Sequence, residues 1–156
     1  MRLPEDDVGN VIQPGDRAFT SAVQTMVDGT VMFTVSGGPI DILALRSTLV
    51  TANSSLAATL QYKFNPSVGS AQAISGASAA LTSALAGTAV DLVPTALTTA
   101  PTVTLAGSGG LGVQSVLNKV RVPAGTMTAV FATSSVTGTW QHHLRYAPLS
   151  PNATVG

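Results

Sequence analysis

Apolar and polar residues alternate with a period of two along much of the chain, which is the pattern of a strand that buries one face. The sequence VMFTVS at residues 31–36 shows this pattern, with Val31, Phe33 and Val35 predicted on one face and Met32, Thr34 and Ser36 on the other. The last run, TWQHHLRY at residues 139–146, repeats the pattern. Its predicted inward face carries Trp140, His142, Leu144 and Tyr146, and its outward face carries Gln141, His143 and Arg145.

Other apolar runs, bounded by Gly, Pro, Asn or Ser, predict the remaining strands. They lie at residues 40–50, 60–64, 89–93, 102–106, 111–116, 120–122 and 127–133. About eight short strands at intervals of roughly 8 to 15 residues, with no convincing helical spacing between them, predict an all-β domain. We expect a β-sandwich, with the jelly roll among the strand arrangements that the pattern leaves open.

The two ends of the chain lack this periodicity. Residues 1–28 contain two prolines and two glycines and predict an extended N-terminal arm, with a short helical turn or a strand near residues 19–26. The β-sandwich domain is expected to cover residues 29–150, because prolines end the regular structure after the last run. Residues 151–156 are then a C-terminal tail.

Residues 67–88 are rich in Ala, Ser and Gly and fit two interpretations. Residues 78–85 have the composition of a short helix that Gly87 would stop. The same segment fits a strand followed by a loop, and the sequence does not choose between these.

Charged residues make up only 9% of the 156 residues, against about 25% in an ordinary soluble domain. Because the formal net charge is also zero, the chain has little electrostatic protection against association. Two interpretations fit: Thr, Ser and Gly solvate the surface, or much of the surface is covered in an assembly. We favour the assembly.

The charges are unevenly placed along the chain. Residues 1–28 hold five acidic against two basic side chains, a net −3, and the remainder holds five basic against two acidic, a net +3. This asymmetry predicts an acidic arm that docks on the basic body of a neighbouring subunit, with Lys119 and Arg121 among its contacts. The alternative is a solvated tail that is acidic by chance.

Side chains that carry catalysis or bind metals are sparse. Asp41 and Asp91 are the only carboxyl side chains after residue 28, and Asp41, like Arg46, is expected to face outward from its strand. His142 and His143 are adjacent, so in a strand they point to opposite faces and are not expected to share a metal ion. There is no cysteine and no GxSxG motif. We therefore expect no enzyme and no catalytic, cofactor-binding or metal-binding residues.

Binding motifs are weak as well. The segment Gly107–Gly112, GSGGLG, lacks the Lys-Ser/Thr pair and the following helix of a phosphate-binding loop. Lys119 and Arg121 are not part of a basic stripe with interleaved aromatic residues, so nucleic-acid binding is not expected. The acidic start of the chain does not fit a signal peptide. The uncharged stretches are too rich in Gly, Ser, Thr and Pro for a transmembrane helix, so no membrane partner is expected.

Four short motifs resemble patterns found in small virion proteins of tailed bacteriophages. The first is FTVSGGPIDILAL at residues 33–45, which resembles the opening of those proteins. Their closing pattern resembles VPAGTM at residues 122–127, TGTW at residues 137–140 and LRYAPL at residues 144–149. The similarity covers residues 31–51 and 120–149, whereas the middle of the chain differs and the arm is particular to this sequence.

The resemblance implies a head decoration, or cement, protein. Such a protein is a β-rich module, often a homotrimer, that binds the major capsid protein on the outer capsid surface of the virion and stabilises the shell. The alternative is a tail, fibre or neck component of the virion with a host-surface-binding role. Exposed aromatic residues would support a sugar site, but Trp140 and Tyr146 share the predicted core face.

Overall fold

The alternating pattern forms strands in the part of the chain that the computed structural model describes, residues 15–55, 58–106, 119–132 and 138–156. The strands are β1 (Arg17–Thr20), β2 (Gln24–Thr25), β3 (Val31–Ser36), β4 (Ile40–Leu49), β5 (Leu60–Pro66), β6 (Gln72–Ala73), β7 (Ala89–Asp91), β8 (Thr102–Thr104), β9 (Val120–Val122), β10 (Gly125–Phe131), β11 (Thr139–Pro148) and β12 (Thr154–Val155). The strand expected at residues 111–116 lies outside the described residues.

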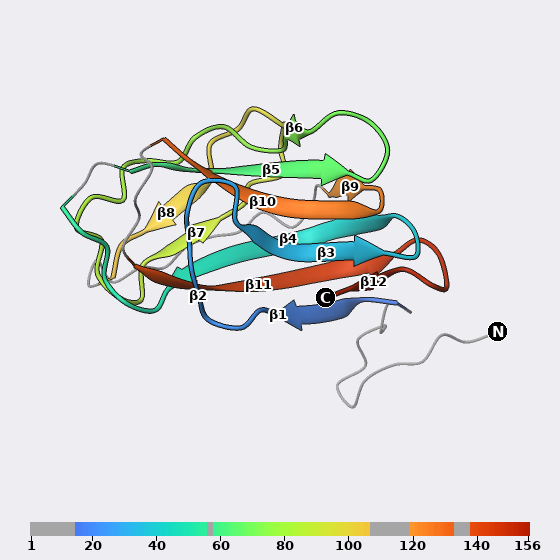
Figure 1. The fold of residues 1–156 in the computed structure, drawn as a ribbon, viewed down its shortest axis with the longest axis horizontal. Helices are drawn as coiled ribbons and strands as arrows, with labels where there is room; N and C mark the ends of the chain where they lie inside the picture. The colour runs from blue at the N-terminus through green and yellow to red at the C-terminus, as the bar shows by residue number, and fades with distance from the viewer. Residues whose placement is uncertain (1–14, 56–57, 107–118, 133–137) are drawn as a thin grey trace.

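The strands form two antiparallel sheets that pack against each other (Figure 1). The seven-stranded sheet has the order β1-β11-β4-β7-β8, with β2 paired to β11 and β9 paired to β4. The five-stranded sheet has the order β12-β3-β10-β5-β6. The predicted all-β sandwich is therefore confirmed. Consecutive strands of the described residues lie in different sheets at seven places, namely β2–β3, β3–β4, β4–β5, β6–β7, β9–β10, β10–β11 and β11–β12.

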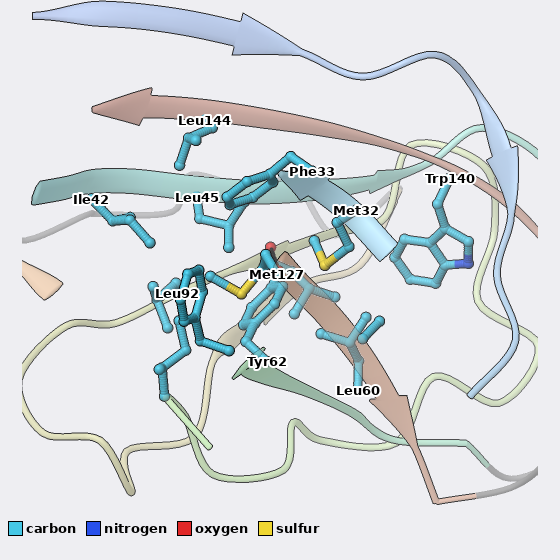
Figure 2. Packing of buried hydrophobic residues seen from close by; sticks show 14 of the residues in the cluster. Met32, Phe33, Ile42, Leu45, Leu60, Tyr62, Leu92, Met127, Trp140 and Leu144 are labelled. Atoms are coloured by element: carbon cyan, nitrogen blue, oxygen red, sulfur yellow. Dashed lines mark hydrogen bonds between the residues drawn. The ribbon is translucent and has the colours of Figure 1, made fainter. Parts of the chain in front are cut away.

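Apolar side chains from both sheets fill the core between them (Figure 2). β4 and β11 supply Leu45 and Leu144, and the facing sheet supplies Phe33, Tyr62 and Met127, all no more than 2% exposed. Burying an aliphatic side chain of this size contributes roughly 1.5–3 kcal/mol. The sandwich is therefore held together mainly by contacts between its sheets.

The predicted faces of β3 are wrong at its start, since Val31 is 45% exposed and Met32 is buried, where the pairing with β10 shifts register. The predicted faces of the last strand are correct. Its inward positions are all buried, whereas His143 and Arg145 are exposed and Gln141 is half-buried. The buried residues are Trp140, His142, Leu144 and Tyr146.

Residues 67–88 form no helix, so the helical interpretation of residues 78–85 is wrong. Only β6 is regular, and the rest of the segment consists of turns and irregular chain beside β5. The hydroxyl groups of Ser75 and Ser78 accept hydrogen bonds from the backbone N–H groups of Tyr62 and Leu60, both at 2.9 Å. Serine side chains disfavour a helix by offering backbone groups such alternative partners. Here they pair with two N–H groups at the edge of β5.

The described ends of the chain, residues 15–28 and 151–156, also belong to the sheets. β1 and β2 pair with β11, so residues 19–26 follow the strand interpretation and not the helical turn. β12 pairs with β3, and Gly156 and Thr34 exchange backbone hydrogen bonds. Ala153 is fully buried. The expected boundary at residue 28 thus lies inside the packed structure, and the C-terminal tail, residues 151–156, adds β12 to the edge of the five-stranded sheet.

Met26 is fully buried, although it precedes the expected start of the domain. The substitution Met26→Ala should therefore destabilise the fold by about 3 kcal/mol, through lost burial and the cavity left behind. Val27→Ala is the matched control, because Val27 is 52% exposed and its truncation should change stability by less than about 0.5 kcal/mol. Urea unfolding of both variants tests this. Equal effects would show that Met26 does not anchor the segment.

Candidate functional site on the outer face of the seven-stranded sheet

Charged side chains gather on the outer face of the seven-stranded sheet. The alternation that turns Leu45 and Leu144 into the core turns Arg46 and Arg145 outward from β4 and β11. Strand register then places opposite charges side by side, with Arg46 beside Asp91 of β7 and Asp41 beside Arg121 of β9. We call this surface the charged face, defined by Asp16, Asp41, Arg46, Asp91, Lys119, Arg121 and Arg145.

Arg46 and Asp91 form a two-point ion pair. Nε of Arg46 donates to Oδ1 of Asp91 at 2.7 Å, and Nη2 donates to Oδ2 at 3.0 Å. The hydrogen bond to Asp91 raises the pKa of Arg46 above its ordinary value, against the opposing effect of partial burial. The carboxyl group is almost fully covered, at 2% exposure, whereas the arginine side chain is 47% exposed.

Asp41 is held in the same way at the other end of β4. Nε and Nη2 of Arg121 donate to its two oxygens at 2.9 and 3.3 Å, and Nζ of Lys119 lies 3.8 Å from Oδ2. Hydrogen bonding to Asp41 raises the pKa of Arg121. Asp41 lies on the outer face of the sheet, as expected, but it is not exposed to solvent, since only 4% of the residue is accessible. Its basic neighbours cover it.

These pairings bear on the two carboxyl side chains that follow residue 28 and on the predicted contacts of Lys119 and Arg121. Asp41 and Asp91 do lie on the same face, but each is engaged by its own arginine and the two form no carboxyl pair. Lys119 and Arg121, expected to meet a neighbour's arm, contact Asp41 of their own chain. Both cations remain more than half exposed.

The burial of Asp91 makes the Arg46 pair sensitive to loss of one partner. Arg46→Met should cost about 2 kcal/mol, because it leaves a buried carboxylate unpaired, while the exposure of Arg46 limits the penalty. The double variant Arg46→Met/Asp91→Val should recover to within about 1 kcal/mol of the parent. Arg145→Met is the control, since its partner Asp16 is 32% exposed and an exposed pair contributes little. A thermal or urea unfolding cycle measures these differences, and no recovery in the double variant would contradict the argument.

The two histidines separate as predicted. His143 is exposed on the outer face, and His142 is fully buried between the sheets. Nε2 of His142 lies 3.4 Å from Sδ of Met26, and a thioether only accepts, so Nε2 carries the proton. Nδ1 then accepts from the Ser47 hydroxyl at 2.8 Å. Burial, with a smaller effect of His143, lowers the pKa of His142 to about 4.

Tyr62 and Ser47 extend this buried network across the sandwich. The Tyr62 hydroxyl oxygen lies 2.9 Å from both the carbonyl oxygen of Val90 and Oγ of Ser47, and its single proton is shared between these two acceptors. Since Tyr62 belongs to β5 and the other two belong to β4 and β7, the network joins the two sheets. Burial raises the pKa of Tyr62. Sequence reasoning missed Ser47 and Tyr62, although a serine at an inward strand position was a usable signal.

The glycine motifs of the resemblance form tight corners at one end of the sandwich. Gly37, with φ of +74°, packs against the backbone of Asn152 and begins the bend from β3 to β4. Gly125 begins β10 with φ of +155° and packs against Asn65 and Pro66. Positive φ and a close backbone approach both favour glycine. These motifs therefore build the scaffold.

A hollow of about 280 Å³ opens beside this end of the sandwich. Its described lining is mainly apolar, with Phe64, Ile74, Leu97 and Val122, and Arg121 of the charged face also borders it. Leu97 is 48% exposed.

Two further findings concern the part of the chain that the structure describes. The residues included there contain no cluster of three or more His, Asp or Glu side chains that could hold a metal ion. No helix in the same part has the length and hydropathy needed to cross a membrane. The glycine-rich segment Gly107–Gly112 lies outside it.

Comparison with known proteins gives no relative from which a function can be transferred. No family model, no curated protein and no solved structure matches the chain.

Proposed function

We propose that this chain is a non-enzymatic structural protein of a bacteriophage virion, a decoration protein that binds the outer head surface as an oligomer and stabilises it. The observation that carries the proposal is the segregation of charge between the two faces of the sandwich. The strands of the seven-stranded sheet hold Arg17, Asp41, Arg46, Asp91, Arg121 and Arg145. Those of the five-stranded sheet hold Lys63 as their single charged residue.

Such a two-faced module suits attachment to a lattice. The charged face supplies directional contacts, which favour one orientation of a bound subunit. The opposite face is mainly Thr, Ser, Asn and Gln, which remain solvated without strong attraction for other molecules. Several weak contacts made together by the subunits of an oligomer resist dissociation far better than one contact does.

The use of polar side chains within the fold also supports a structural role. Arg46, Arg121 and Arg145 are paired inside the chain. His142 and Tyr62, whose residue types often act in catalysis, are enclosed in the core and hydrogen-bonded to core partners. The resemblance at residues 31–51 and 120–149 then supports a phage head protein among structural proteins.

Imaging of the native particle by electron microscopy tests the proposal. Density for the sandwich is expected on the outer head surface, at threefold or quasi-threefold positions if the oligomer is a homotrimer. A complementary measurement is binding of the purified protein to heads from which it has been removed. Density confined to the tail, fibres or neck would instead support the host-surface-binding alternative and overturn the decoration role.

A further inference from the structure

We infer that the charged face is the docking site for the acidic N-terminal segment, Glu5–Asp7, of a second copy of this chain. The inference deepens the proposed function, because it rests on the protein acting as an oligomer and names the contact between subunits. Its principal receptor is the cationic corner formed by Lys119 and Arg121, with Arg145 further along the same face.

The charged face presents cations outward and keeps most of its carboxylates beneath them. The side chains of Arg46, Lys119, Arg121 and Arg145 are 47%, 58%, 70% and 56% exposed. The carboxyl groups of Asp91 and Asp41 are 2% and 6% exposed. Four cations against three carboxylates, including Asp16, leave the face at +1. An approaching acidic segment therefore meets positive charge first.

The guanidinium groups are also held ready for a second partner. Arginine has five N–H donors in a fixed plane. Asp41 accepts hydrogen bonds from Nε and Nη2 of Arg121, and Asp91 accepts hydrogen bonds from the same two nitrogens of Arg46. Nη1 of each arginine makes no hydrogen bond to another described residue. Since the buried carboxylates already orient these side chains, a bound carboxylate costs less side-chain entropy.

The chain itself contains the complementary charge. Residues 1–14 hold Glu5, Asp6 and Asp7 against Arg2, a net side-chain charge of −2. The same face already accepts one carboxylate from the N-terminal part, since Nη2 of Arg145 donates to Asp16 at 3.2 Å. Fourteen residues precede Gly15, and a chain of that length reaches at most roughly 50 Å when extended.

The direction of β1 favours a second copy over the same copy. β1 runs antiparallel to β11, and Gly15 lies against the ring of Pro148 at the end of that strand. The described part of the chain thus begins at the end of β11 and at the edge of the sheet. To reach Arg121 of its own chain, the segment would have to turn and cross β11 and β4. A neighbouring copy can meet it without that reversal.

Sedimentation of the full-length chain over a range of protein and salt concentrations tests the inference. The first variant, Glu5→Gln/Asp6→Asn/Asp7→Asn, keeps the face intact. The second, Lys119→Gln/Arg145→Gln, keeps the segment intact and leaves Asp41 and Asp91 with their arginines. Each should raise the dissociation constant of the oligomer about tenfold or more. Lys63→Gln, on the opposite face, is the control and should leave it unchanged.

Mixing the two variants separates contact between copies from contact within one copy. One variant then supplies the segment and the other supplies the face, so mixed oligomers should form more tightly than either variant alone. A wild-type chain that stays monomeric, or variants that associate as tightly as the wild type, would overturn the inference. Salt-sensitive association of a protein that is absent from heads would sink the decoration role and leave this contact standing. If the protein is found on heads but both variants associate as tightly as the wild type, the decoration role stands and the proposed contact is overturned.

Discussion

Acidification from pH 7 to pH 4 should remove about 3 kcal/mol of stability through His142 alone. The ring is neutral and fully buried, and burial lowers its pKa from 6.5 to about 4. Above pH 6.5 both the folded and the unfolded states hold this ring neutral, so its contribution is complete. Between pH 6.5 and 4 only the unfolded state takes up the proton, so stability falls with pH. Each pKa unit corresponds to about 1.4 kcal/mol.

Urea unfolding at several pH values between 7 and 4 measures this effect. His142→Gln should be less stable at neutral pH, because it disturbs the contacts to Ser47 and Met26. Its stability should nevertheless depend less on pH than that of the parent. His143→Gln is the control, since that side chain is exposed and should leave most of the pH dependence in place. If His142→Gln and the parent lose stability in parallel, the buried ring is not the cause.

Gly125→Ala should destabilise the sandwich by about 4 kcal/mol, combining overpacking with a positive φ. A Cβ at this position would lie 2.7 Å from Cα of Pro66 and 2.9 Å from Cε1 of Phe64, and would also meet the carbonyl oxygen of Asn65. Backbone atoms of a neighbouring strand cannot move aside as a flexible side chain can. The corner before β10 and the pairing of β10 with β5 should both loosen.

Gly29→Ala separates the two components of that effect. Gly29 has φ of +83°, but a Cβ there would meet nothing within 4 Å. Its substitution should therefore cost only the backbone strain, about 1 kcal/mol. Midpoints of chemical denaturation for the two variants provide the comparison. Similar midpoints would mean that the structure relieves the collision at Gly125. The VPAGTM motif at residues 122–127 would then require glycine only for its backbone conformation.

The sequence predicted the main strands of the fold from local pattern. The period of two correctly assigned the two faces of β11, including His142 inward and His143 outward. Residues 67–88 resisted this reasoning, because Ser75 and Ser78 act through hydrogen bonds to β5 that no local pattern encodes. The same limit hid the role of Met26, which lies in a segment without the alternating pattern but contacts His142, 116 residues further along the chain.

The candidate site divides in a similar way. Scarce charge and its uneven distribution were visible in the sequence, and they directed attention to the cations of the body. The pairing of Arg121 with Asp41, 80 residues apart, was not visible. It depends on β9 lying beside β4, and strand order is decided by packing between distant segments. The exposure of Asp41 was misjudged for this reason, since a residue on the outer face can still be covered by its neighbours.

By itself, then, the sequence determined where the main strands lie, which side chains point inward along most of their length, and how little charge the surface can hold. These properties follow from backbone geometry and composition, which act over a few residues. The tertiary structure decided which strands are neighbours, and hence that most of the body's charges meet on one face above buried carboxylates. Only that arrangement converts a scattered set of seven charged side chains into a surface with a direction, because charge interactions depend on distance in space and not on separation along the chain.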